Sequence, residues 1–78
     1  MDNIKTTIGA FLKSKRISKS LTGKELAMKL NVSQQQISRY ERGVCNISIE
    51  MVMKYCQVLD ISGYELMKEL FTSKNDNM

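Results

Sequence analysis

The chain of 78 residues is long enough for one small domain with a small hydrophobic core. It has no proline and few alternating apolar and polar runs, so we predict an all-α fold. The net charge is +4, and no apolar run has the length of a membrane span or the form of a secretory signal, so we expect a cytoplasmic protein without membrane contact.

The cysteine and histidine content excludes most metal and catalytic chemistry. Cys45 and Cys56 are the only cysteines and the chain has no histidine, so one chain cannot complete a four-ligand zinc site of Cys and His residues. Cys56 falls in an apolar helical pattern and is interpreted as a small core residue. The chain has no glycine-rich phosphate loop and no credible pair of nucleophile and base. We therefore expect no metal, no cofactor and no enzymatic activity.

Positive charge is concentrated in the first half of the chain. Residues 1–43 carry nine Lys or Arg against three Asp or Glu, whereas residues 44–78 carry three against five. A basic half is typical of a surface that faces nucleic-acid phosphates, but a solvated surface of mixed charge has the same composition. Charge alone does not decide between these two interpretations.

The first predicted helix spans about residues 3–17, with Asp2 or Asn3 as its N-cap. Apolar residues recur in it at spacings of three and four, and these predict a buried stripe of Ile4, Ile8, Phe11 and Leu12. Cations interact favourably with the dipole at the end of a helix, and the last turn contains Lys13, Lys15 and Arg16. Residues 18–20 then break the pattern.

Residues 21–43, LTGKELAMKLNVSQQQISRYERG, predict two short helices joined by a tight turn. The first spans about residues 23–30, with Thr22 as N-cap and Glu25 completing a capping box. Its predicted inner face consists of Leu26, Ala27 and Leu30. Asn31 follows at the turn, where Asn tolerates a left-handed backbone.

The second of these helices spans about residues 34–41, and Ser33 with Gln36 predicts a second capping box at its start. Gly43 accepts a positive φ and is expected to end the helix. The predicted inward side chains are Val32, Ile37 and Tyr40, and the outward ones are Gln34, Gln35, Ser38, Arg39 and Arg42. This is the layout of a helix-turn-helix, whose second helix enters the DNA major groove with its N-terminal residues against base edges.

Two more helices complete the prediction. One spans about residues 49–59 behind the cap Ser48, and its predicted inner side chains are Ile49, Val52, Cys56 and Leu59. The last spans about residues 64–71 behind Ser62, and its apolar side chains include Leu66, Met67, Leu70 and Phe71. We expect a single domain over residues 1–71 and a flexible C-terminal tail over residues 72–78.

A series of short motifs occurs in a particular order between residues 8 and 62: Ile8, Leu12–Arg16, Leu21-Thr22, Glu25–Ala27, Ser33–Gln35, Ile37-Ser38, Tyr40–Gly43, Ser48–Glu50, Val52 and Leu59–Ser62. In this order the chain resembles the Cro/C1-type (XRE) helix-turn-helix regulators, the phage-repressor-like family. The resemblance implies a compact five-helix, lambda-repressor-like DNA-binding domain. The whole sequence also resembles the small regulators encoded with fimbrial operons in enteric bacteria, which link adhesion to motility.

Two positions depart from the family pattern. Such proteins usually have Gln at the start of the first helix of the pair, where its side chain reaches a DNA phosphate, and this chain has Gly23. Backbone N–H groups at that helix start remain able to bind phosphate. Asn31 replaces the usual turn glycine. The first departure is expected to reduce affinity or to shift the docking, and neither removes the fold.

The start of the second helix provides the candidate base-reading residues. Glutamine donates and accepts at once, which suits N6 and N7 of adenine, so we assign base reading to Gln34 and Gln35. Arg39 and Ser38 lie further along the same face, and Arg39 suits guanine or a phosphate. The alternative is that three glutamines only solvate an exposed helix. We favour base reading because a helix-turn-helix points this face at the groove.

Phosphate contacts add salt-sensitive affinity without sequence information. The candidates are Thr22, Lys24, Gln36, Arg42, Asn46 and the backbone of residues 43–47. Lys13, Lys15 and Lys19 either contribute more loosely or are only solvated. The family resemblance also implies a structural salt bridge between Arg16 and Glu41, which would orient the reading helix.

The predicted function is that of a sequence-specific transcriptional regulator, a repressor or dual regulator associated with the nucleoid, and the narrower resemblance implies fimbrial or motility genes as targets. A module this small normally needs two half-sites, so we expect a homodimer on a pseudo-palindromic operator of double-stranded DNA. No small-molecule ligand is expected. The candidate dimer residues either form that interface or close the monomer core: Tyr64, Met67, Leu70 and Phe71. The alternative function is an antitoxin-type protein-binding module that also binds its own operator.

Overall fold

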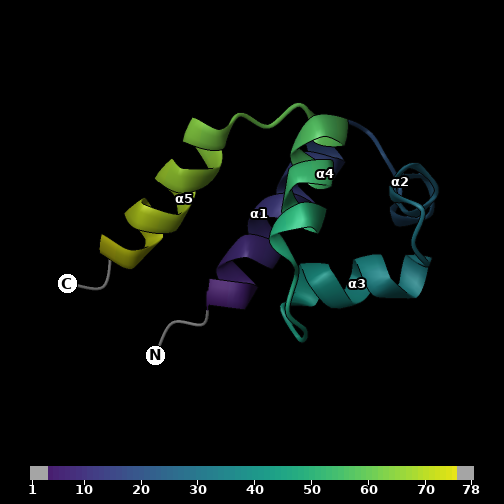
Figure 1. Cartoon of the computed structure of the whole chain (residues 1–78), viewed down its shortest axis with the longest axis horizontal. Coiled ribbons are helices and arrows are strands. Elements are labelled where there is room, and N and C mark those ends of the chain that lie inside the picture. Colours follow the sequence, from purple (N-terminus) through teal and green to yellow (C-terminus); the bar gives the residue numbers. More distant parts are fainter. Residues whose placement is uncertain (1–3, 76–78) are drawn as a thin grey trace.

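The computed structural model describes residues 4–75, and the side chains of residues 4–72, as five α-helices joined by short turns (Figure 1). The helices are α1 (Ile4–Ser18), α2 (Gly23–Leu30), α3 (Gln34–Arg42), α4 (Ile49–Leu59) and α5 (Gly63–Asn75). The described residues contain no β-strand. The prediction of an all-α domain with five helices is therefore confirmed.

The predicted ends of the helices agree with the structure except at α5. Helices α2 and α4 begin and end at the predicted residues, and α3 ends one residue later, at Arg42. Helix α5 continues past Phe71 to Asn75, so the predicted helix end is wrong. The reason is that neither glycine nor proline interrupts residues 72–75. The predicted first N-cap and residues 76–78 of the predicted tail lie outside the described residues.

Side-chain caps fix where the helices start. The Thr22 Oγ1 accepts from the Glu25 N–H at 3.0 Å, and a Glu25 carboxylate oxygen accepts from the Thr22 N–H at 2.8 Å, which confirms the first capping box. These hydrogen bonds from Thr22 lower the pKa of the Glu25 carboxyl. The second predicted box is only half formed. Ser33 accepts from the Gln36 N–H, but the Gln36 amide reaches the α3–α4 loop, where it donates to the Cys45 Sγ.

Left-handed residues turn the chain between helices. Asn31 has φ +60° and Gly43 has φ +71°, as predicted for both positions. The Asn31 N–H donates to the carbonyl oxygens of Ala27 and Met28, which closes the end of α2. The sequence did not predict the same backbone conformation at Ser20 (φ +59°) and Asp60 (φ +57°).

The hydrophobic core lies between α1, α2, α3 and α4, and its fully or almost fully buried side chains are Leu12, Leu26, Ala27, Leu30, Ile37, Val52, Tyr55, Leu59 and Ile61. Two predictions of burial are wrong, because Ile4 is 60% exposed and Ile49 is 74% exposed. Each is the first residue of its helix and projects beyond the packed turns. Tyr55 was not predicted in the core, although it lies between Val52 and Leu59 on the inner side of α4.

Helix α1 approaches the C-terminal end of α3 closely enough to require glycine at two positions. Gly9 is buried, and a Cβ there would overlap the carbonyl oxygen of Tyr40 and lie 2.6 Å from that of Glu41. A Cβ at Gly43 would lie 2.6 Å from the Cα of Thr6. The predicted apolar stripe of α1 did not include Gly9, so this approach was not foreseen.

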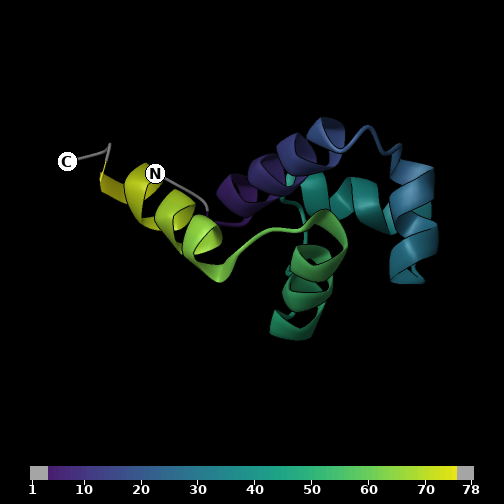
Figure 2. The ribbon, with the colours of Figure 1, turned by 90° about the horizontal axis from the view of Figure 1, so that it is seen from above.

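The helices extend along one long axis. Helices α1 and α2 pack on α3, helix α4 packs on α1 and α2, and α5 packs on α1. Both views show α2 and α5 at opposite ends of the molecule (Figures 1 and 2). Figure 2 also shows that α2 and α4 project toward the same side. The helix-turn-helix and the last helix are therefore separate surfaces.

Tyr55 places a polar group inside the core. Its side chain has no exposed surface, and its hydroxyl has no hydrogen-bond partner among the described residues. The ring meets that of Tyr40 edge to face, with centroids 6.2 Å apart. Burial raises the pKa of the Tyr55 hydroxyl far above its ordinary value, and the nearby Glu41 charge adds to this shift.

The raised pKa of Tyr55 predicts that the protein loses stability at alkaline pH. Because the folded-state pKa of Tyr55 is above the unfolded value of 10.0, its contribution to stability is fully present below that pH and is lost as the pH rises further. We expect the free energy of unfolding of the wild type to fall, relative to Tyr55→Phe, by about 1.4 kcal/mol for each pH unit above 10. Urea unfolding of both proteins between about pH 8 and pH 11 measures this difference. A constant difference would contradict the assignment.

Candidate nucleic-acid interface

Helices α2 and α3 form a rigid pair with one face left open. The turn between them is closed by the Val32 N–H, which donates to the Ala27 carbonyl at 3.0 Å. Leu26, Ala27 and Leu30 are buried in α2, whereas Ile37 is the one buried residue of α3. Most of the surface of α3 is therefore free to meet a partner.

The predicted reading face is exposed. Gln34, Gln35, Ser38 and Arg39 of α3 are all exposed, and their predicted outward orientation agrees with the structure. Tyr40 is half-buried and packs against the core. The arrangement presents amides and a guanidinium at the start and middle of one helix, which are groups that can hydrogen-bond to base edges.

The three consecutive glutamines occupy different surroundings. Gln34 lies alongside α2, with its Cγ 3.8 Å and its Nε2 4.0 Å from where a Cβ at Gly23 would be. Gln35 is exposed. Gln36 is half-buried and its Nε2 lies 3.4 Å from the Cys45 Sγ, so its side chain is already engaged inside the protein. The structure therefore separates Gln36 from the two base-reading candidates.

The candidate phosphate-contacting residues lie around this face. Lys24 is exposed near the start of α2, Arg42 at the end of α3, and Asn46 in the following loop. The Thr22 hydroxyl is engaged in the capping box of α2. Helix α2 begins at Gly23, where the first backbone N–H groups have no partners within the helix.

The three lysines with the looser assignment separate in the structure. Lys13 lines a shallow hollow of about 260 Å³ together with Gly23 and Gln34. Lys15 instead faces α5, where it forms an ion pair with Glu65 and lies over the Phe11 ring. The Lys19 Nζ lies 4.0 Å from the Asp60 carboxylate on an exposed surface. Of the three, only Lys13 adjoins the candidate interface.

Arg16 and Glu41 join α1 to the end of α3. The Arg16 Nε donates to Glu41 Oε2 at 2.6 Å and Nη2 donates to Oε1 at 3.1 Å, which is a bidentate pair. The Arg16 Nη1 also donates to the Leu21 carbonyl at 2.8 Å. The side chains are 14% and 7% exposed. The hydrogen bond to Glu41 raises the pKa of the Arg16 guanidinium.

The candidate dimer residues divide between two faces of α5. Tyr64, Met67 and Phe71 are 77%, 48% and 58% exposed, whereas Leu70 is half-buried. Of the two alternatives for these residues, closure of the monomer core therefore does not describe Tyr64, Met67 and Phe71. The reason is that α5 packs on α1 and covers only a narrow stripe that contains Leu66 and Leu70.

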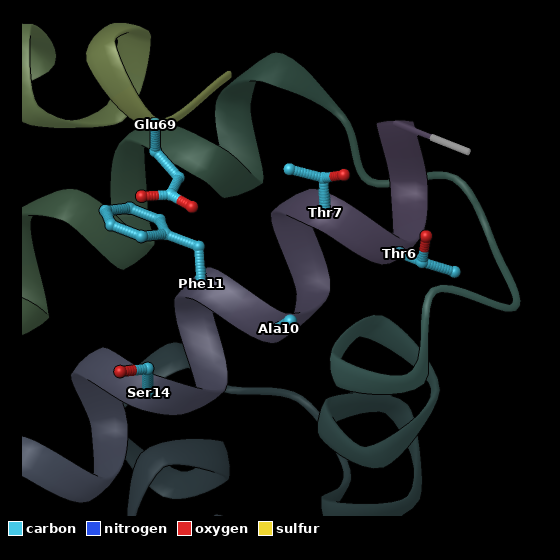
Figure 3. A pocket seen from close by; sticks show the side chains of 6 residues that line it. All are labelled: Thr6, Thr7, Ala10, Phe11, Ser14 and Glu69. Carbon is cyan, nitrogen blue, oxygen red and sulfur yellow. The ribbon is translucent and has the colours of Figure 1, made fainter. Parts of the chain in front are cut away.

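A second hollow, of about 460 Å³, lies between α1 and α5 (Figure 3). The Glu69 carboxylate of α5 extends toward the Phe11 ring of α1 in this view. Thr6, Thr7, Ala10 and Ser14 complete the lining. Within residues 4–75, no group of three or more His, Cys, Asp or Glu is placed to hold a metal ion. None of the helices described by the structure is both long and apolar enough to cross a membrane.

Comparisons with known proteins agree with this geometry. The family described as Helix-turn-helix matches residues 12–66 of the chain. The crystal structure of the clp gene regulator ClgR from Corynebacterium glutamicum is similar, with a TM-score of 0.84 and 32% identity over 94% of this chain and 95% of that one. The structure has the lambda-repressor-like helix-turn-helix fold, as predicted.

Two further proteins are similar. A mutant of the restriction-modification controller protein C.Esp1396I has a TM-score of 0.80 and 24% identity, over 94% of each chain, which shows the fold alone. Antitoxin PezA from Streptococcus pneumoniae is 34% identical over 62 residues, which is 80% of this chain and 39% of PezA. The chain thus spans well under half of the length of that curated relative.

The Arg16–Glu41 pair predicts a large effect of removing one partner. Arg16→Met or Glu41→Gln leaves a largely buried polar group unpaired, so each should lower the free energy of unfolding by about 3 kcal/mol. The double variant should lose less than the sum of the two losses. Urea unfolding measures all three. Lys19→Ala, which removes an exposed pair, is the control and should cost less than about 0.5 kcal/mol. Additive losses would mean that the two side chains do not interact.

Proposed function

Since the chain belongs to the helix-turn-helix family of Cro/C1-type DNA-binding transcription regulators, we propose that it reads a specific operator with α3 and binds it as a homodimer. This family consists of DNA-binding regulators and not of enzymes. The observation that carries the proposal is the exposed polar face of α3, a helix whose opposite face packs on the core through Ile37 and Tyr40. In this fold a helix with such a face is the one that enters the major groove.

Base reading is assigned to the start of α3. Gln35 is exposed, and its amide suits the N6 and N7 atoms of adenine. Gln34 lies beside it at the edge next to α2, and Ser38 and Arg39 follow on the same face. Arg39 suits either guanine or a phosphate. These assignments make the first turn of α3 the main source of sequence specificity.

Phosphate binding is assigned to the residues around this face. Lys24, Arg42 and Asn46 are exposed at the start of α2, the end of α3 and the next loop, where the DNA backbone would run on either side of the groove. Gln36 and Thr22 are weaker members of this group, because the structure engages the Gln36 amide with Cys45 and the Thr22 hydroxyl with Glu25. Lys13 adds positive charge at the hollow beside Gly23.

Substitutions separate the two roles. Gln35→Ala should remove about 1–3 kcal/mol of discrimination at particular base pairs, and Gln34→Ala should relax a neighbouring one. Arg42→Ala should weaken binding to all sequences alike and reduce the salt slope by about one. The measurements are affinities for a selected operator and its single-base variants at several salt concentrations. Lys54→Ala, at an exposed position of α4 with no proposed DNA or dimer contact, should change neither. Unchanged specificity in both glutamine variants would contradict groove reading.

The homodimer is proposed to form through the outer face of α5. Tyr64, Met67 and Phe71 leave an apolar surface that α1 does not cover, at the end of the molecule opposite α2. The hollow between α1 and α5 adjoins this helix (Figure 3). Two such domains would present two reading helices to a pseudo-palindromic operator.

Oligomeric state tests the interface. We expect the wild type to have twice the mass of one chain in light scattering after gel filtration, and Met67→Glu or Phe71→Glu to shift it toward the monomer because a carboxylate would be buried. Met53→Glu is the matched control, since Met53 of α4 is 59% exposed and Phe71 is 58% exposed. A wild type that stays monomeric at high concentration would contradict the dimer.

A second candidate function is that of an antitoxin-type module that also binds its own operator. The similarity to antitoxin PezA favours it, although the matched part is 39% of PezA. Purification of the tagged chain from its native host distinguishes the two. A stoichiometric protein partner that remains bound in high salt would support the antitoxin function, and recovery of the homodimer alone would support the operator-binding regulator.

The resemblance to fimbrial-operon regulators adds a proposal for the target genes. It rests on sequence resemblance and does not follow from the geometry of α3. Genome-wide mapping of the bound DNA in the native host decides it, because bound sites upstream of fimbrial or motility genes support the proposal and their absence contradicts it.

A further inference from the structure

Gly23 and Gln34 face each other across the junction of α2 and α3. A Cβ at residue 23 would lie 3.8 Å from the Gln34 Cγ and 4.0 Å from its Nε2, which is ordinary van der Waals contact. Both residues line the shallow hollow that also includes Lys13 and Ser38. A methyl group at residue 23 would therefore contact the Gln34 side chain at its Cγ and Nε2 without overlap.

Gln36, the third glutamine of α3, makes a hydrogen bond within the protein that Gln34 does not make. The Gln36 amide is held by a hydrogen bond to Cys45 and its side chain is half-buried. The Gln34 side chain is exposed, and within the described residues its amide makes no hydrogen bond. Its neighbour across the junction is a residue without a side chain. No side chain at residue 23 therefore packs against Gln34.

A flexible side chain discriminates weakly when it must become ordered to read a base. Ordering offsets part of the hydrogen-bond energy gained at the correct base pair, whereas no ordering is needed at a base pair that Gln34 does not bind. Reducing the number of free rotamers therefore strengthens binding to the correct base pair more than binding to the others. Glycine at residue 23 has the opposite effect.

We propose that residue 23 is a positioning residue for base reading, and that Gly23 makes recognition permissive at the base pair read by Gln34. This rests on the proposed function of α3 as the DNA-reading helix. Residue 23 does not act on Gln35, because no atom of Gln35 lies within 4 Å of where a Cβ at residue 23 would be. The operator should accordingly be weakly specified at the base pair read by Gln34 in each half-site. The chain would then tolerate related operators that differ at that position.

The test compares Gly23→Ala with the wild type. A methyl group at residue 23 contacts Gln34 without overlap. We expect this contact to restrict the rotamers of Gln34. Operators are first selected from random double-stranded DNA, and affinities are then measured for the full set of single-base variants. The base pair of Gln34 is the one at which Gln34→Ala relaxes discrimination. At that base pair, Gly23→Ala should increase discrimination about threefold, and at the base pair of Gln35 it should change nothing.

The chain provides a matched control in Gly63. Like Gly23, it is the first residue of a helix that follows a hydroxyl cap, and a Cβ there would meet nothing within 4 Å. Gly63→Ala should leave discrimination unchanged at every position. The double variant Gly23→Ala/Gln34→Ala should lose the gain, because the proposed effect acts through Gln34.

The outcomes separate the inference from the proposed function. An equal change at all base pairs, or no change at the base pair of Gln34, overturns the role of residue 23 and leaves α3 as the reading helix. Persistence of the gain in the double variant overturns it as well. Failure to select any operator, or a selected operator at which neither Gln34→Ala nor Gln35→Ala changes discrimination, overturns the proposed function and the inference together.

Discussion

The close crossing of α1 over the C-terminal end of α3 is the contact on which the rest of the structure depends. At Gly9 the two backbones approach so closely that no Cβ fits between α1 and the carbonyl groups of Tyr40 and Glu41. Gly43, which ends α3 in a left-handed conformation, meets Thr6 in the same way. Two glycines thus set the distance between the first helix and the one that carries the reading face.

Polar contacts then fix the orientation that the glycines permit. Arg16 holds Glu41 through a bidentate pair and also binds the Leu21 carbonyl, so one guanidinium connects the ends of α1 and α3 with the segment before α2. The buried Ile37 side chain packs α3 onto the hydrophobic core. Because these contacts are all on the inner side or at the far end of α3, the side chains of Gln34 and Gln35 in its first turn remain exposed. A rigid support with an open polar face is what sequence reading requires.

The sequence predicted the elements that follow from local chemistry. The Thr22–Glu25 box, the left-handed Asn31 and the glycine cap at Gly43 depend on neighbouring residues alone. What was missed depends on packing between distant segments. Nothing local marks Gly9 as a crossing point or directs the Gln36 amide to Cys45, and the apolar pattern of α5 did not reveal which side α1 covers. The roles of the candidate site residues remain predictions.

The free energy of unfolding of Gly9→Ala tests the central contact most directly, with Gly63→Ala as the control at an open position. Alanine favours a helix over glycine by about 1 kcal/mol, so helix propensity alone predicts a more stable protein. The close crossing predicts the opposite sign, a loss of about 1–3 kcal/mol in urea unfolding, because α1 and α3 must move apart. A Gly9→Ala protein as stable as the wild type, or more stable, would contradict the account.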